Sequence, residues 1–274
     1  FSLDIFLEDS SEEVKTGRIR SIFLTLSNLS LVLAPIIVAF LVVGNDFSEI
    51  YLLSTIILVP LFITALISFN KFKDYPRIKT NVLQIFVNVF KKRDVFHSVL
   101  CACILEFFYA WMVIYTPIYL HQVIGFSWST IGFAFTVMLL PFVLFEIPIG
   151  RMADLYIGEK EIMTVGFIIT GLSTLLIPFL GTSSIFVWMA LLFVTRIGAS
   201  FIEITNESYF FKHVDSKDPD TISVFRMMRP VSFILAPFVA GVSFIFMPIS
   251  SGYFILAPIV LLGVFWSSKL KDTR

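Results

Sequence analysis

Long runs of apolar residues are the feature that most constrains this chain. A helix of roughly 20 apolar residues is long enough to cross the hydrocarbon core of a bilayer, which is about 30 Å thick. Inside that core each backbone N–H and C=O needs a partner within the segment, so such runs form helices. Only 15% of the residues are charged, whereas soluble domains contain about 25%. We therefore predict an all-α membrane protein with almost no soluble portion.

The apolar runs divide the chain into about eight expected transmembrane helices. Prolines within several of them would break a soluble helix, but neighbouring helices re-satisfy the freed carbonyls in a membrane bundle. The expected spans are Ile22–Gly44, Ile50–Asn70, Val95–Leu120, Trp128–Ile149, Ile162–Leu180, Ile185–Ser208, Ile222–Met247 and Tyr253–Ser268.

Apart from three arginines within the spans, lysine and arginine lie in alternate connections and at the two ends of the chain. The segments 45–49, 121–127, 181–184 and 248–252 contain neither residue, whereas the other connections and both ends of the chain contain several. Cytoplasmic loops carry such an excess of basic residues. We expect both ends to face the cytoplasm, across a bacterial inner membrane.

Two halves of the chain repeat a short pattern. The segment SLVLAP at 30–35 matches SFILAP at 232–237, and LVPL at 58–61 matches LAPI at 256–259. The two offsets, 202 and 198 residues, are nearly equal and predict a duplicated unit of six spans. The chain starts at Phe1 rather than Met, so we expect about four preceding spans to be missing. Residues 1–70 then end a first six-helix bundle, 71–94 form a cytoplasmic linker with an amphipathic helix, and 95–274 form a second bundle.

A loop between two expected spans, GRMADLYIGEK at 150–160, contains Gly, then Asp four residues on, then Gly and Lys. It resembles the loop motif of the major facilitator superfamily, and TGRIR at 16–20 is similar to the entry into that family's fifth helix. The resemblance implies helices 5–12 of a twelve-helix secondary transporter. Such a protein moves a small solute by alternating access, either coupled to protons or not. It needs no cofactor and is monomeric when full length.

The resemblance also implies a gating role for the loop, formed by Gly150, Arg151, Asp154, Gly158 and Lys160. Asp154 can accept hydrogen bonds at the positive end of another helix, which would begin near Gly17. Such a contact would form in one conformation and break in the other. The alternative is an ordinary polar turn in which Asp154 caps its own neighbours.

Ionisable residues inside the spans are the candidates for a solute site. At 100° per residue, Arg196, Ser200, Glu203 and Glu207 share one helix face. A charge at the bilayer centre is costly, so this face should point into the bundle or a water-filled cavity. We expect a substrate and coupling cavity in which Arg196 binds an anionic group and Glu106 a cation or proton. Its expected lining is Glu106, Tyr109, Arg196, Ser200 and Glu203.

The alternative to a solute site is a structural ion pair of Arg196 with Glu106 or Glu203. Nearer the cytoplasm, the spans carry further charges that could form an interhelical network, serving either a gate or static packing. Asp218 and Pro219 are typical of an N-cap and the first helical position, which places two arginines about two turns inside the next helix. The expected network consists of Glu146, Glu203, Glu207, Arg226 and Arg229.

The sequence contains no motif typical of an enzyme, an ATP-driven pump or a metal site. No H-E-x-x-H, G-x-S-x-G or P-loop motif occurs, and the histidines have no metal-ligand spacing, which argues against an enzyme, an ATP-driven pump or a metal site. The net charge of zero gives no reason to expect nucleic acid. The triplets at Asn28 and Asn206 fit the glycosylation pattern but fall within spans, so we discount them. A non-transporting receptor or scaffold of the same fold is the remaining alternative.

Overall fold

The computed structural model describes residues 22–30, 32–33, 37, 48–68, 87, 89–214 and 218–271. Within these residues all regular structure is helical. The α-helices are α3 (Ser48–Ser68), α5 (Arg93–Gln122), α6 (Trp128–Met152), α7 (Glu159–Leu176), α8 (Ile185–His213), α9 (Pro219–Phe246) and α10 (Tyr253–Ser267). A π-helical turn, η3 (Ala153–Ile157), follows α6. The short 3₁₀ helix η4 (Ile177–Phe179) follows α7, and η5 (Ile249–Gly252) precedes α10.

Six helical segments of the described chain are long and apolar enough to span a membrane. They begin within four residues of six expected spans, and the all-helical fold class is confirmed. A seventh expected span corresponds to α3, whose apolar stretch Ser48–Thr64 is shorter. The first expected span is described only at 22–30, 32–33 and 37, where residues 22–30 are helical. The count of eight therefore stays a prediction.

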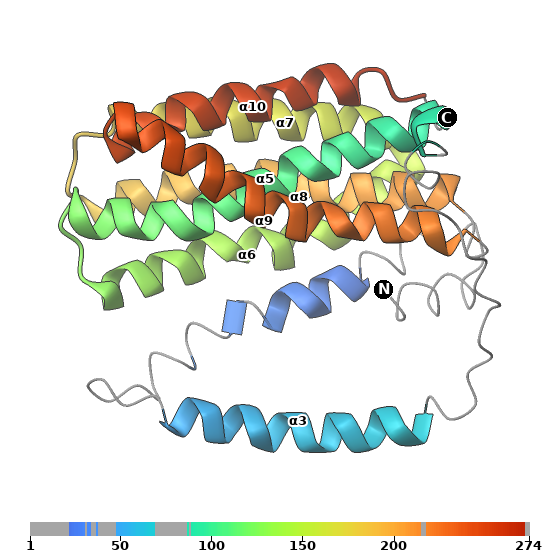
Figure 1. Cartoon of the computed structure of the whole chain (residues 1–274), viewed down its shortest axis with the longest axis horizontal. Helices are drawn as coiled ribbons and strands as arrows, with labels where there is room; N and C mark the ends of the chain where they lie inside the picture. Colours follow the sequence, from blue (N-terminus) through green and yellow to red (C-terminus); the bar gives the residue numbers. More distant parts are fainter. Residues whose placement is uncertain are drawn as a thin grey trace.

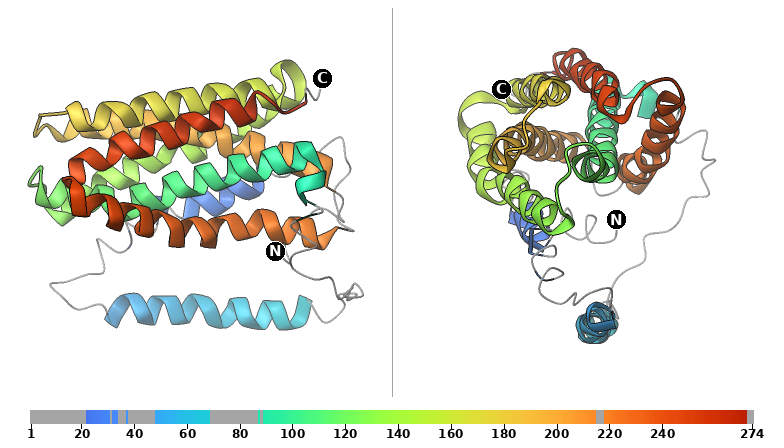
Figure 2. Two further views of the ribbon diagram at one scale, coloured as in Figure 1. Left: turned by 45° about the horizontal axis from the view of Figure 1, so that its top comes forward. Right: turned by 90° about the vertical axis from the view of Figure 1, so that its left-hand side faces the viewer.

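Helices α5 to α10 form one bundle, seen from the side in Figure 1 and end-on in the right panel of Figure 2. Helix α8 packs against α6 and α7, α7 against α10, and α5 against both α10 and α9. The buried core contains large aromatic side chains such as Trp111, Trp188 and Phe167. The helical segment 22–30 lies beside this bundle, whereas α3 lies apart from it (Figures 1 and 2).

Glycine allows α7 and α8 to approach backbone to backbone. A Cβ atom built on Gly198 would lie 2.6 Å from the carbonyl oxygen of Gly166 and 2.4 Å from Oγ1 of Thr170. Small residues at a helix interface are the usual device for close packing in membranes, where helices gain little from hydrophobic burial. This contact fixes α8, and with it the charged residues that α8 carries.

Side-chain hydrogen bonds connect α5 to its neighbours. Ser98 Oγ donates to Asn206 Oδ1 on α8 at 2.7 Å, and Tyr253 of α10 donates to Thr116 at 3.1 Å. Ser232 of α9 donates to the carbonyl oxygen of Cys103 at 3.0 Å. Polar side chains within an apolar medium need partners, and here those partners lie on adjacent helices, so they set the register of the bundle.

Candidate functional site

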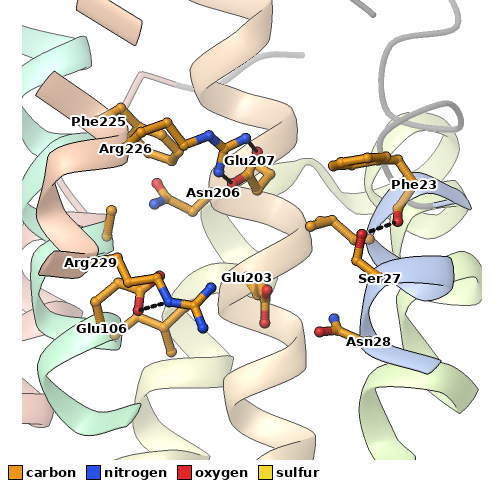
Figure 3. A pocket seen from close by; sticks show the side chains of 13 residues that line it. Phe23, Ser27, Asn28, Glu106, Glu203, Asn206, Glu207, Phe225, Arg226 and Arg229 are labelled. Carbon is orange, nitrogen blue, oxygen red and sulfur yellow. Dashed lines mark hydrogen bonds and ion pairs between the residues drawn. The ribbon is translucent and has the colours of Figure 1, made fainter. Parts of the chain in front are cut away.

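A cavity of about 320 Å³ opens between the helical segment 22–30 and helices α5, α8 and α9. Figure 3 shows it with the polar side chains pointing inward from these elements. Its wall is apolar at Leu24, Ala102 and Leu105 and aromatic at Phe23 and Phe225. The polar lining residues are Ser27, Asn28, Glu106, Glu203, Asn206, Glu207, Arg226 and Arg229.

Arg226 makes a bidentate contact with one glutamate. Arg226 donates from both terminal nitrogens to Glu207: Nη2 lies 3.0 Å from Oε2, and Nη1 contacts Oε1. A bidentate pair of this kind is the strong form of an Arg–carboxylate contact. Glu207 is 7% exposed, so the arginine compensates its buried charge.

Arg229 and Glu106 make a much looser pair. The Nε atom of Arg229 lies 3.9 Å from Oε2 of Glu106, and Glu106 Oε2 accepts no hydrogen bond from any part of the chain that the structure describes. The Arg229 side chain is 66% exposed. A pair at this distance gains little, so both groups can bind other charges.

Glu203 has no cationic partner within ion-pair distance among the described residues. Its Oε2 accepts a 2.7 Å hydrogen bond from the Tyr109 hydroxyl of α5, and its carboxylate faces the cavity (Figure 3). The lining thus contains three glutamates and two arginines, and only one of the glutamates is tightly paired. The cavity therefore presents an excess of acid.

Three of the residues expected in the cavity lie outside its lining: Tyr109, Arg196 and Ser200. Tyr109 contacts the lining indirectly, because its hydroxyl donates to Glu203. Arg196 is 1% exposed, and its guanidinium lies 4.8 Å from the centre of the Phe108 ring and 5.8 Å from that of Tyr109, as in cation–π contacts. The Ser200 hydroxyl donates to the carbonyl of Ile197 within α8.

Neither ion pair considered for Arg196 forms in the described chain, because its contacts are aromatic rather than acidic. Its Nη1 atom is buried without a hydrogen-bond partner. The guanidinium lies behind Tyr109, whose hydroxyl holds Glu203. Arg196 therefore lies outside the cavity lining, in contact with the tyrosine that donates to Glu203.

The expected charge network divides into separate contacts. Glu207 pairs with Arg226, while Arg229 approaches Glu106 rather than a residue of the network. Glu146 is fully buried and contacts neither arginine; it accepts hydrogen bonds from Thr25 and Asn28 of the segment 22–30. The hydrogen-bond partners of Glu146 could not be predicted from the sequence alone, because they lie more than 100 residues away from it along the chain.

The loop motif forms a second polar cluster where α6, η3 and α7 meet the last turn of α8. Gly158 has φ 96° between η3 and α7, a left-handed conformation that favours glycine. Nζ of Lys212, near the end of α8, lies 2.7 Å from Oδ1 of Asp154 and also contacts Glu159. Asp154 therefore binds another helix of the same bundle rather than its own turn.

Within the part of the chain that the structure describes, the other residues of the motif make no side-chain ion pair. Arg151 is exposed and Gly150 is buried, while the backbone carbonyl of Lys160 accepts a hydrogen bond from Thr164. The partner expected for Asp154 near Gly17 lies outside the described residues. A gating role of the motif stays a prediction.

Several lining residues were not predicted from sequence: Phe23, Ser27, Asn28 and Asn206. A signal for the two asparagines was present, since a polar amide within a membrane span rarely faces lipid. Asn206 is held by Ser98 of α5, and Asn28 reaches Glu146. No sequence signal separates Phe23 and Phe225 from the many other phenylalanines.

Comparison with known proteins identifies the family of this bundle. The family model of the Major Facilitator Superfamily matches residues 125–274, which is more than half of the chain and covers α6 to α10. No curated protein matches the chain. The match agrees with the loop motif at 150–160 and with the six apolar helices that can span a membrane. This integral membrane protein therefore belongs to the Major Facilitator Superfamily, whose members are membrane transporters.

Proposed function

We propose that the chain is part of a secondary active transporter that moves a small solute bearing a positively charged group. The observation that supports this proposal is the cavity lined by Glu106, Glu203 and Glu207 against Arg226 and Arg229. A charge within a membrane span is expensive, and such residues mark solute or ion pathways. Family membership supports transport in general, and the lining supports the class of solute.

The charge arrangement indicates how a solute would bind. An ammonium group placed near Glu203 would replace the missing cation of that carboxylate, and it could also donate to the free Oε2 of Glu106. Phe23 and Phe225 offer ring faces to the apolar part of the solute. Arg229, exposed and loosely paired, can bind a carboxylate if the solute is zwitterionic.

Alternating access is the proposed mode of movement. The cavity is walled on one side by the segment 22–30 and on the other by α5, α8 and α9, so movement between these two sides would change its exposure. We propose that residues 1–70 complete a first bundle, 71–94 link it to a second bundle at 95–274, and both chain ends are cytoplasmic. The basic loops support this orientation, and a full-length monomer of a bacterial inner membrane would contain all the parts required.

A flux assay with matched variants tests the proposal. Full-length protein in liposomes loaded with a pH-sensitive dye would be exposed to a panel of alkylamines, amino sugars and amino acids. We expect at least one class to produce flux, and Glu203→Gln to reduce it more than tenfold. Glu49→Gln is the control, because Glu49 is exposed at the start of α3 and lies outside the cavity.

Two results would contradict the proposal. One is equal flux in the Glu203→Gln and Glu49→Gln proteins, which would mean that the cavity carboxylate does not contact the solute. The other is the absence of flux for every class on the panel from correctly inserted protein, which would favour a receptor or scaffold of the same fold.

A further inference from the structure

Three carboxylates of the bundle are 7% exposed or less, and among the described residues Glu146 is the one of these three with no cation beside it. Its side chain is 0% exposed, and no lysine or arginine in the described part of the chain lies within ion-pair distance. By contrast, Glu159 contacts Lys212 and Glu207 contacts Arg226. An isolated buried carboxylate is strongly unfavourable and takes up a proton instead.

The two hydrogen-bond partners of Glu146 specify where that proton would be. Asn28 Nδ2 lies 2.7 Å from Oε1, and an amide nitrogen can only donate, so Oε1 must accept. The Thr25 hydroxyl lies 3.2 Å from Oε2, and a hydroxyl can donate or accept. A proton on Oε2 can therefore be donated to Thr25, which leaves every polar atom of the carboxyl group satisfied.

Among the described residues, the charges that act most strongly on Glu146 are acidic and oppose its ionisation. Glu203 and Glu207 of α8 act on it electrostatically, and both are acidic. On the other side of the cavity, α5 contributes Glu106. In η3, which follows α6, Asp154 is paired with Lys212. Arg151, at the end of α6, is exposed. The described residues of the segment 22–33 contribute no charge.

We propose that Glu146 is a proton-binding site that holds the segment 22–30 against α6. With the proton present, Thr25 and Asn28 dock on a neutral carboxyl group. When the O–H bond on Oε2 breaks, its electron pair stays on the carboxylate and the proton passes to solvent water. The buried charge then requires hydration, so the segment separates from α6.

This site connects protonation to the solute cavity through Asn28. Asn28 donates to Glu146 and also lines the cavity, on the segment that would move. Thr25 and Asn28 are separated from Glu146 by 121 and 118 residues in the sequence, so the contact joins the two proposed bundles. Coupling of proton release to solute movement rests on the proposed function, whereas the proton site itself does not.

Distance and protonation can be measured without any solute. Full-length protein lacking Cys101 and Cys103 would carry spin labels at Leu29 and Leu144, which are exposed on the segment and on α6 respectively. Pulsed EPR between pH 5 and 9 would report their separation, and infrared difference spectra would report the protonated carboxyl band. We expect the separation to rise with pH as the band disappears.

Substitutions assign the response to Glu146. Glu146→Gln keeps the acceptor and a donor but cannot ionise, so the short separation should persist at every pH and the carboxyl band should be absent. Glu49→Gln should behave as the parent protein. Thr25→Val provides a second variant: because the Thr25 hydrogen bond exists only while the segment is docked on the protonated carboxyl group, its loss weakens that state and should move the midpoint downward by about half to one pH unit.

The outcomes separate this proposal from the transport proposal. A pH-independent separation in the parent protein, or a pH response that survives in Glu146→Gln, would overturn the proton site. Glu203→Gln should abolish solute flux but retain the pH response. In flux assays, acceleration by an imposed pH gradient should be lost in Glu146→Gln, and undiminished acceleration would overturn the coupling role alone. If no solute were transported at all, the EPR and infrared results would still decide the proton site.

Discussion

The Tyr109 hydroxyl donates a 2.7 Å hydrogen bond to Oε2 of Glu203 and thereby joins α5 to α8 at the wall of the cavity. It is the side-chain hydrogen bond that holds this carboxylate in place. Because the other face of the Tyr109 side chain lies near the Arg196 guanidinium, the tyrosine connects a buried cation to a cavity anion. The first prediction follows from this contact.

Tyr109→Phe should weaken amine binding more than it lowers stability. The substitution removes a hydrogen bond to a charged group, which contributes about 1.5–3 kcal/mol, and leaves the ring that covers Arg196. We expect roughly a tenfold loss of affinity, measured by the solute concentration that half-protects the protein against thermal unfolding. Tyr115→Phe is the control, because Tyr115 lies outside the cavity lining. Equal affinity in both variants would show that Glu203 does not depend on Tyr109.

Arg226→Gln should destabilise the protein clearly more than Arg229→Gln. The first change leaves Glu207 buried without its bidentate partner, at a cost of about 1–3 kcal/mol, below the full cost for a wholly buried pair. The second breaks an exposed contact at 3.9 Å, worth less than about 1 kcal/mol. The melting temperatures of the two variants measure the difference in stability. Glu207→Gln, alone and combined with Arg226→Gln, completes a double-mutant cycle for the Arg226–Glu207 pair. Equal losses would contradict the geometry of the two pairs.

Gly198→Ala should impair folding of the α7–α8 pair. The added Cβ would lie 2.6 Å from the Gly166 carbonyl, and overpacking of this kind costs about 1–3 kcal/mol. Gly132→Ala on α6 is the matched control, since a Cβ there meets nothing within 4 Å. Yield and melting temperature in detergent are the readouts. Normal stability of Gly198→Ala would mean that the two helices do not pack backbone to backbone.

Asp218 should contribute stability that disappears in acid. Burial raises the pKa of this carboxyl, but hydrogen bonds from Lys92 and Thr221 more than offset burial and hold the pKa below its usual value. A lowered folded-state pKa gives stability that is full above the unfolded pKa of about 3.9 and is lost as pH falls through the folded pKa. Melting temperatures of Asp218→Asn and the parent protein should therefore differ at pH 7 and converge in strong acid. A difference that stays constant with pH would contradict this account.

The helix positions could be predicted because membrane spans leave a strong signal. Asp218 is observed as the N-cap of α9, with Thr221 donating to its side chain and Pro219 following, as the sequence indicated. Helix α8 continues to His213, beyond the expected end at Ser208, because Glu207 and Lys212 find partners on neighbouring elements. Hydropathy alone ends a span at such charges.

The pairing of the charged residues could not be predicted, since a helical stripe defines a face but not its neighbour. Arg196 and Glu203 share the stripe on α8, yet Arg196 packs on aromatic rings and Glu203 faces the cavity. Likewise, the partners of Glu146 are neutral residues, and no sequence pattern favoured them over other polar residues. Which charges meet depends on how the helices rotate against one another, and that is set by packing across the whole bundle.

The most direct test of transport through this cavity is the accessibility of Ser27, which lines it and is exposed. Ser27→Cys, in full-length protein without Cys101 and Cys103, would be treated with a membrane-impermeant thiol reagent in right-side-out and in inverted vesicles. The account predicts labelling from both sides, slowed by the amine that the flux assay identifies. Labelling from one side only, at a rate unaffected by that amine, would contradict it.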